Sequence, residues 1–85
     1  MNPLNVAETV LPSGAFASIR KPTVLDYFMT MSAEYWQVAM IARIVTIDGK
    51  KLSYAEWLEM DLEEFGPVLG LFVLVMAKFT FKGVI

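Results

Sequence analysis

The first twenty residues combine a turn signal with apolar positions on either side of it. Residues 6–11 and 15–20 are predicted to form the two strands of a β-hairpin, because residues 11–14 read LPSG and place Pro and Gly where a type I turn prefers them. Alternation within the strands is imperfect, although one side stays apolar, with Val10, Leu11, Phe16 and Ile19. A lone hairpin is only marginally stable in water, so this one must pack on the rest of the chain.

The pattern changes to helical spacing after Pro22, which ends the second predicted strand. Thr23 is a good helix N-cap, and Asp26 completes the spacing of a capping box. These residues predict a short helix from residue 24 to about residue 31.

Ser32 is the next candidate N-cap and opens a predicted helix over residues 33–47, with Glu34 in its first turn. Asp48 and Gly49 follow directly. We favour these two residues as the end of the helix. The alternative is a two-residue hairpin turn, whose flanking residues are too few for more than a bridge.

Two capping signals lie close together further along the chain. Ser53 with Glu56 predicts a short helix through Glu59, and Asp61 with Glu64 repeats the same spacing before the last segment. Two such signals imply two separate helices.

The last segment contains an early break at Gly66 and Pro67. The final helix therefore either starts at Pro67 or begins near Asp61 and kinks. Residues 67–77 are apolar without interruption, which is shorter than the about 20 residues of a membrane-spanning helix. We favour a buried helix, with a membrane insertion over residues 67–81 and a buried strand as the alternatives.

The predicted helix over residues 33–47 is apolar around more than one face. Glu34 and Gln37 fall on one side of it, and Arg43 lies roughly opposite Glu34. A surface helix of a monomer normally has one apolar stripe, so this helix is expected either to be central to the domain or to lie between its own core and another chain. We favour the second alternative, because few helices of an 85-residue protein can be covered on all sides. The isolated protein is accordingly expected to form dimers or larger closed assemblies.

Composition supports association as the source of stability. The chain has 85 residues, of which 56% are hydrophobic and 13% aromatic, and it contains no Cys and no His. A fold of this size is stabilised by disulfides, by a structural metal or by association. Disulfides and the usual zinc ligand sets are excluded, which leaves association.

The same composition argues against catalysis, nucleic-acid binding and secretion. Serine nucleophiles lack a histidine base, and we expect neither enzymatic activity nor a cofactor or metal. The net charge of −2 gives no general attraction for nucleic acid. Residues 1–11 show no basic region followed by an apolar stretch, so we expect a cytoplasmic protein.

Three stretches in a fixed order resemble a known family. They are residues 11–14 in the turn, residues 20–26 with the sequence RKPTVLD, and residues 44–50, IVTIDGK, leading into residues 52–62, LSYAEWLEMDL. Together they resemble the short tail assembly chaperones of phages with contractile tails, in which a hairpin precedes a compact set of helices.

This resemblance implies a role in phage tail assembly in the cytoplasm of the bacterial host. Such chaperones bind the long, helical tape measure protein, keep it soluble until tail tube subunits polymerise around it, and are not part of the mature virion. Several of these phages also make a longer frameshift product of the same gene, which is a further partner that the resemblance suggests. The competing hypotheses are a small membrane-associated phage protein and a structural tail or baseplate component.

The predicted fold is a single α+β domain over residues 1–85, mostly α, with a β-hairpin in residues 1–21 and three to five helices in residues 22–85. Trp36 and Trp57 are both expected to be largely buried. The predicted partner-binding surface combines the helix over residues 33–47 with the last helix. Its residues are Trp36, Met40, Phe72, Met76 and Phe79, with Lys78 and Lys82 at the rim.

Overall fold

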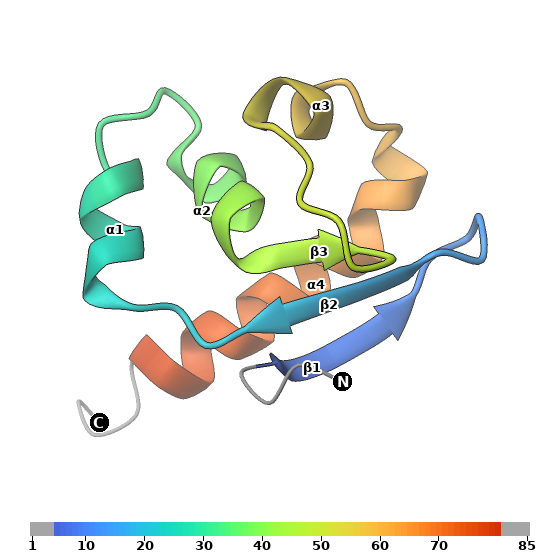
Figure 1. The fold of residues 1–85 in the computed structure, drawn as a ribbon, viewed down its shortest axis with the longest axis horizontal. Helices are drawn as coiled ribbons and strands as arrows, with labels where there is room; N and C mark the ends of the chain where they lie inside the picture. Colours follow the sequence, from blue (N-terminus) through green and yellow to red (C-terminus); the bar gives the residue numbers. More distant parts are fainter. Residues whose placement is uncertain (1–4, 81–85) are drawn as a thin grey trace.

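The computed structural model of the protein describes residues 5–80. In chain order, the elements are β1 (Asn5–Val10), β2 (Phe16–Arg20), α1 (Val24–Thr30), α2 (Trp36–Ile44), β3 (Val45–Ile47), α3 (Tyr54–Leu58) and α4 (Leu62–Thr80) (Figure 1). The α+β fold class, the N-terminal hairpin and a number of helices between three and five are thus confirmed. Lys82 and the ends of the predicted single domain lie outside the described residues.

The predicted hairpin is confirmed, and its turn needs the glycine. β1 and β2 pair antiparallel, with Val10 opposite Phe16. The backbone N–H of Gly14 donates to the carbonyl oxygen of Leu11 at 2.8 Å, and Gly14 has a φ of +91°, which favours glycine. The turn is also tied to α4, because the backbone N–H and the hydroxyl of Ser13 each donate to the Glu64 carboxylate at 2.7 Å.

Two predicted caps form as their sequences indicate. Thr23 and Asp26 make a complete capping box at the start of α1, and Ser53 and Glu56 make another at the start of α3. The predicted ends of both helices agree with the structure to within a residue.

The single helix predicted over residues 33–47 is wrong at both ends. The helix starts only at Trp36, with Tyr35 rather than Ser32 as N-cap, so Glu34 precedes the helix instead of lying in its first turn. Residues after Ile44 leave the helix and form β3, which pairs antiparallel with β2. The reason is the β-branched run Val-Thr-Ile, which suits an extended strand once a partner strand is present.

Asp48 and Gly49 form the hairpin-type turn that we did not favour. Their φ angles are +51° and +81°, and the turn closes with a bridge between Ile47 and Lys50. Their interpretation as a helix terminator is therefore wrong, because β3 already separates them from α2.

Helix α4 begins at Leu62 and continues through Pro67, so the alternative with an early start is the right one. Within residues 5–80, no helix is both long and apolar enough to cross a membrane. The final segment instead lies against the sheet, where it packs across β1 and β2.

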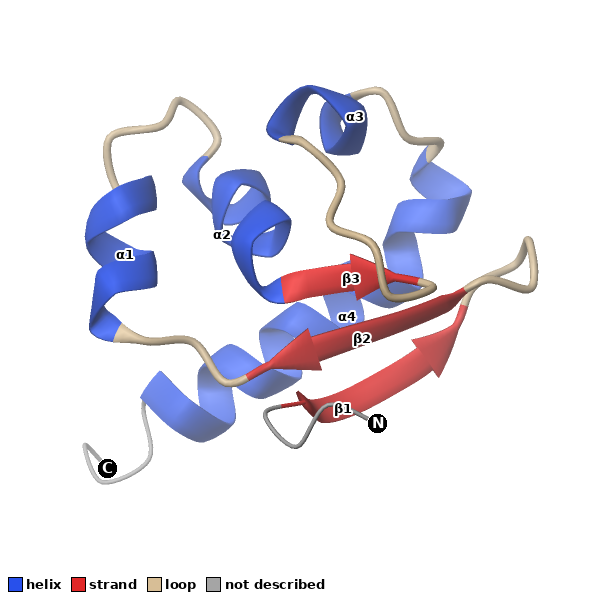
Figure 2. Cartoon of the chain, viewed as in Figure 1, coloured by secondary structure: helices blue, strands red, loops and turns tan. Residues whose placement is uncertain are grey.

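The strands lie in the order β1-β2-β3, and the core fills the space between one face of this sheet and the helices (Figure 2). Ala17, Ile19 and Val45 are the strand residues buried there. α2 contributes Met40, Ile41 and Ile44, and α4 contributes Val68, Phe72 and Val75. Leu11 and Trp57 complete the buried cluster.

The burial expected for the two tryptophans is confirmed for one and wrong for the other. Trp57 is buried, and its ring and that of Phe65 meet in a T-shaped arrangement. Trp36 is 36% exposed. Because α2 starts at Trp36, the indole lies at the end of the helix, one turn before the first fully buried residue, Met40.

Candidate partner-binding surface

Helix α1 is attached to the protein by its polar residues. Its two buried side chains are Asp26, 1% exposed, and Thr30, 2% exposed. The apolar side chains around them are 49–72% exposed. We call these apolar side chains, together with that of Met31, the α1 surface: Val24, Leu25, Tyr27, Phe28, Met29 and Met31. An ordinary surface helix has the opposite arrangement, with its apolar stripe toward the core.

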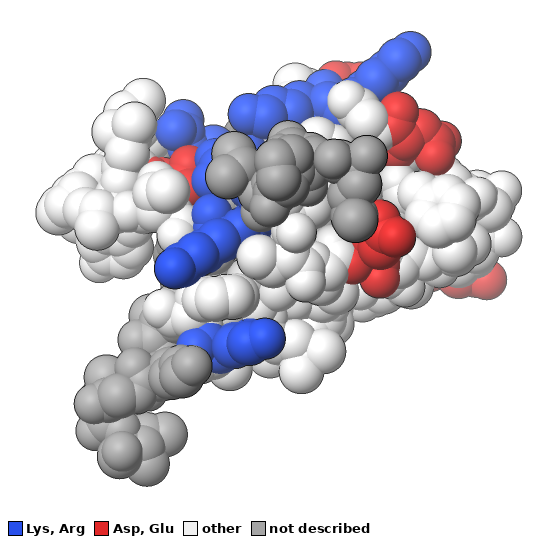
Figure 3. Space-filling view, turned by 60° about the horizontal axis from the view of Figure 1, so that its bottom comes forward, with Lys and Arg blue, Asp and Glu red and all other residues white. Residues whose placement is uncertain are grey.

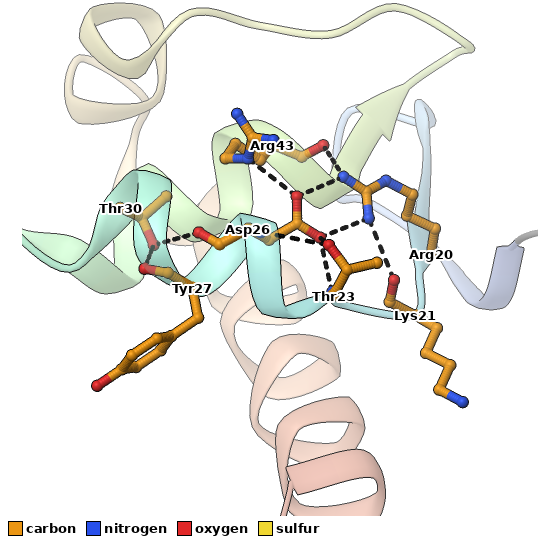
Figure 4. A network of polar contacts seen from close by, with 7 residues as sticks. All are labelled: Arg20, Lys21, Thr23, Asp26, Tyr27, Thr30 and Arg43. Carbon is orange, nitrogen blue, oxygen red and sulfur yellow. Dashed lines mark hydrogen bonds and ion pairs between the residues drawn. The ribbon is translucent and has the colours of Figure 1, made fainter.

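Asp26 accepts hydrogen bonds from three neighbouring residues (Figure 4). The two terminal nitrogens of Arg20 donate to its two oxygens, each at 2.7 Å, and Nε of Arg43 donates at 2.9 Å. The backbone N–H and hydroxyl of Thr23 add bonds of 2.8 and 3.0 Å. A buried carboxylate is stable when its lone pairs are satisfied in this way.

These contacts fix the charge of the network and the position of α1. The Arg20 guanidinium has the largest effect and holds the pKa of Asp26 well below its usual range, with help from Thr23 and Arg43 and against the effect of burial. The same contact raises the pKa of Arg20. Arg20 also donates to the carbonyl oxygen of Arg43 at 3.3 Å. The network therefore joins the end of β2 to α1 and α2.

Thr30 completes the inward-facing polar side of α1. Its hydroxyl donates to the carbonyl oxygen of Asp26 at 2.8 Å, one turn earlier in the same helix. With Asp26 and Thr30 turned inward, the other side chains of α1 lie at the sides of the helix or face away from the protein. Figure 4 shows the Tyr27 ring pointing away from the network.

The α1 surface is too concentrated to be chance exposure. Single exposed apolar residues are normal, but contiguous apolar patches of a few hundred Å² mark interaction sites. Here six residues between positions 24 and 31 are large, apolar and exposed, and the rings of Tyr27 and Phe28 lie edge to face, 5.5 Å apart. The next exposed aromatic residues are Tyr35 and Trp36.

A groove lies beside this surface, where the C-terminal part of α4 approaches α1 (Figure 1). We call it the α1–α4 groove. It has a volume of about 290 Å³. The residues that line it are Pro22, Thr23, Val24, Tyr27, Met40, Met76 and Phe79.

Comparisons of this chain with protein-family models, curated proteins and solved structures give no match. The surface must therefore be interpreted from its own geometry.

The structure brings together three of the five residues predicted to bind a partner. Met40, Met76 and Phe79 all line the α1–α4 groove, although Met40 is otherwise buried. Phe72 is 4% exposed and belongs to the core, so its side chain is not available as a contact. Trp36 is exposed at the start of α2 and does not line the groove.

The α1 surface was not predicted, although the sequence contains a signal for it. In residues 24–31, VLDYFMTM, Asp26 and Thr30 are the only polar residues, and they are four positions apart. That spacing places them on one face of a helix. The capping role of Asp26 can be read from the sequence, but it does not indicate whether the side chain is buried or exposed.

Two acidic residues, one in α3 and one in α4, have structural roles. The backbone N–H of Ser53 holds the pKa of Glu56 below its usual value, as expected for a capping carboxylate. Glu64 accepts both hydrogen bonds from Ser13. In the part of the chain that the structure describes, no group of acidic side chains could hold a metal ion.

Proposed function

We propose that this protein is a tail assembly chaperone that binds the tape measure protein through the α1 surface and the α1–α4 groove. One observation carries the proposal: α1 uses its only two polar side chains to attach to the protein and leaves its apolar side chains exposed. Contact between these apolar side chains and water is unfavourable in free energy, and a second chain that covers them would remove it.

The shape of the site suits a helical partner. Grooves bordered by apolar residues commonly accept the apolar face of an amphipathic helix. Met29, Met31, Met40 and Met76 add unbranched side chains that adapt to irregular targets. The tape measure protein is a long helical chain, and it is the partner that the resemblance in residues 11–62 suggests.

The proposed setting follows from the same resemblance. The protein would act in the host cytoplasm before tail tube subunits assemble, and it would leave before the virion is complete. In the family that the chain resembles, the frameshift lies near the end of the short gene, so a longer product would carry the same α1 surface.

Co-expression with the tape measure protein tests the proposal. We expect the wild-type chain to keep the tape measure protein soluble and to purify with it. Replacing Leu25 and Phe28 together by Glu should abolish both effects, because these side chains are 61% and 62% exposed and lie at the centre of the α1 surface.

Leu62→Glu is the matched control, since Leu62 is 80% exposed but lies in the first turn of α4, away from α1. It should leave binding unchanged. If the wild-type chain does not change the solubility of the tape measure protein and does not purify with it, the proposed function is wrong.

A further inference from the structure

Basic side chains lie next to the α1–α4 groove even though the whole chain carries a net charge of −2. Nζ of Lys21 lies 5.2 Å from the centre of the Phe79 ring, and Nζ of Lys78 lies 5.5 Å from it. We call these two exposed lysines the basic rim. Neither forms an ion pair with any residue between positions 5 and 80.

The neighbouring ion-pair network adds to this positive charge. Arg20 and Arg43 share the single carboxylate of Asp26, so one positive charge there is not neutralised. Both arginines and Lys21 line a second hollow of about 460 Å³, which shares Pro22 and Thr23 with the groove. Around the groove and this neighbouring hollow together, four cationic side chains are therefore balanced by one carboxylate.

The acidic residues are concentrated elsewhere. Five of the nine lie in α3, in the first turn of α4 and between these helices: Glu56, Glu59, Asp61, Glu63 and Glu64. Figure 3 shows Lys and Arg side chains on both sides of the notch between the α1 end of the molecule and the end of α4, whereas Asp and Glu lie mostly on the other half. The charge distribution is thus strongly asymmetric.

From this arrangement we infer that the α1–α4 groove accepts an apolar side chain from an amphipathic helix whose flanking residues are acidic. The inference rests on the proposed function, because it specifies the chemistry of the segment that the chaperone would bind. The apolar floor of Met40, Met76 and Phe79 would hold the side chain, and the basic rim would pair with the flanking carboxylates.

The position of the two lysines supports an acidic partner. Each ammonium group is close enough to the Phe79 ring for a cation–π contact, which keeps it at the mouth of the groove. A carboxylate entering beside the apolar side chain would meet both cations without displacing an existing ion pair. Opposite charges at a rim mainly increase the association rate and select the partner.

A protein helix fits this site better than an anionic membrane. A lipid surface is contacted by a convex apolar face with a surrounding belt of basic residues. The basic rim instead borders a concave slot between two helices, which suits one inserted side chain. Binding to lipid is therefore an outcome of the test rather than part of the proposal.

Two synthetic peptides provide the test with the full-length chain. Both carry the same leucines and phenylalanines on one face of a helix, but one has Glu and the other Lys at the flanking positions. Fluorescence anisotropy should show the acidic peptide binding at least about tenfold more tightly, with a preference that weakens between about 50 mM and about 500 mM salt.

Charge reversal of the basic rim should reverse this preference. In the Lys21→Glu, Lys78→Glu double variant, we expect the acidic peptide to bind roughly two- to fivefold more weakly per substitution and the basic peptide to bind more tightly. The Lys50→Glu, Lys51→Glu variant changes the charge equally, beside the Gly49 turn, and should keep the wild-type preference. The two double variants have the same net charge, so a reversal seen only in the Lys21→Glu, Lys78→Glu variant cannot come from net charge, and a circular dichroism spectrum like that of the wild type shows that this variant is folded.

Equal binding of the two peptides, or equal behaviour of the two double variants, overturns the inference. Binding to phosphatidylglycerol vesicles with no binding of either peptide also overturns it. The co-expression experiment separates this inference from the proposed function. A Lys21→Glu, Lys78→Glu variant that still solubilises the tape measure protein fully would leave the chaperone proposal intact and reject only the acidic partner segment.

Discussion

Helices α1 and α4 are both rich in apolar residues, yet they attach to the protein by opposite kinds of side chain. α4 buries Val68, Phe72 and Val75, which are spaced along one face, and leaves Val73 and Leu74 exposed. α1 buries an aspartate and a threonine and exposes almost everything else. The apolar content of a helix therefore does not tell which of its faces is inside.

The difference has consequences for how each helix is stabilised. α4 is held mainly by apolar area, which is spread over several residues and does not depend on pH, with the two Ser13–Glu64 hydrogen bonds added at its first turn. α1 is held mainly by one carboxylate shared between two guanidinium groups. A helix attached in that way can present an apolar surface to a partner without losing its place on the protein.

Truncating α4 at its centre should have the largest effect on stability. Phe72→Ala removes a core aromatic ring and should lower the free energy of unfolding by about 3–5 kcal/mol, measured by urea denaturation. Val73→Ala, at the exposed neighbour, should change it by less than about 0.5 kcal/mol.

If Phe72→Ala does not fold, Phe72→Leu gives a smaller change that can still be measured, of about 1 kcal/mol. Equal effects at Phe72 and Val73 would show that α4 is not held by the face described here.

Removing the charge of Asp26 should have a smaller but pH-dependent effect. Asp26→Asn keeps the shape of the side chain and leaves Arg20 and Arg43 facing a neutral amide. The loss should be about 2–3 kcal/mol at neutral pH, below the value for a fully buried pair because both arginines are partly exposed.

The direction of the pH dependence follows from the lowered pKa of Asp26. The stabilisation is fully present above the pKa of the unfolded chain, about 3.9, and is lost as the pH falls toward the lower pKa of the folded state. Between about pH 5 and about pH 2, the urea midpoint should therefore fall more for the wild type than for Asp26→Asn. Glu63→Gln, at an exposed carboxylate, should follow the wild type. Parallel curves for wild type and Asp26→Asn would contradict the role of the network.

Local signals account for the parts of the fold that were predicted correctly. The hairpin turn and the caps at Thr23 and Ser53 depend on residues within four positions of each other, so the sequence contains all that is needed. Such local signals do not predict β3. Its residues continue the apolar pattern of α2, and they become a strand because β2, distant in the sequence, lies beside them.

The site shows the same division between local and distant information. Met40, Met76 and Phe79 were proposed as contacts by residue type, since methionine and aromatic residues are common at interfaces, and the structure places all three beside the α1–α4 groove. The orientation of α1 was missed because it depends on Arg20 and Arg43, which approach Asp26 only in the folded chain. The periodicity of a helix gives the position of its faces but not which face another element will cover.

The smallest effect on stability should come from the α1 surface, where the effect on association should be largest. Without its partner, the protein has only other copies of itself to cover this surface, so we expect it to self-associate. Leu25→Ser with Phe28→Ser should change the free energy of unfolding by less than about 0.5 kcal/mol per residue, because both side chains are exposed. Light scattering at high protein concentration should show a shift toward the monomer mass.

Leu62→Ser replaces a side chain that is even more exposed, but at the start of α4, and it should leave the mass unchanged. Comparing the two variants distinguishes a specific interface from non-specific hydrophobic association, because loss of any exposed leucine would reduce non-specific association. If the wild-type protein is monomeric under these conditions, the α1 surface stays exposed to water without causing association. The different attachment of α1 and α4 would then have no role in binding, because the apolar side of α1 would be stably exposed to water without a second chain.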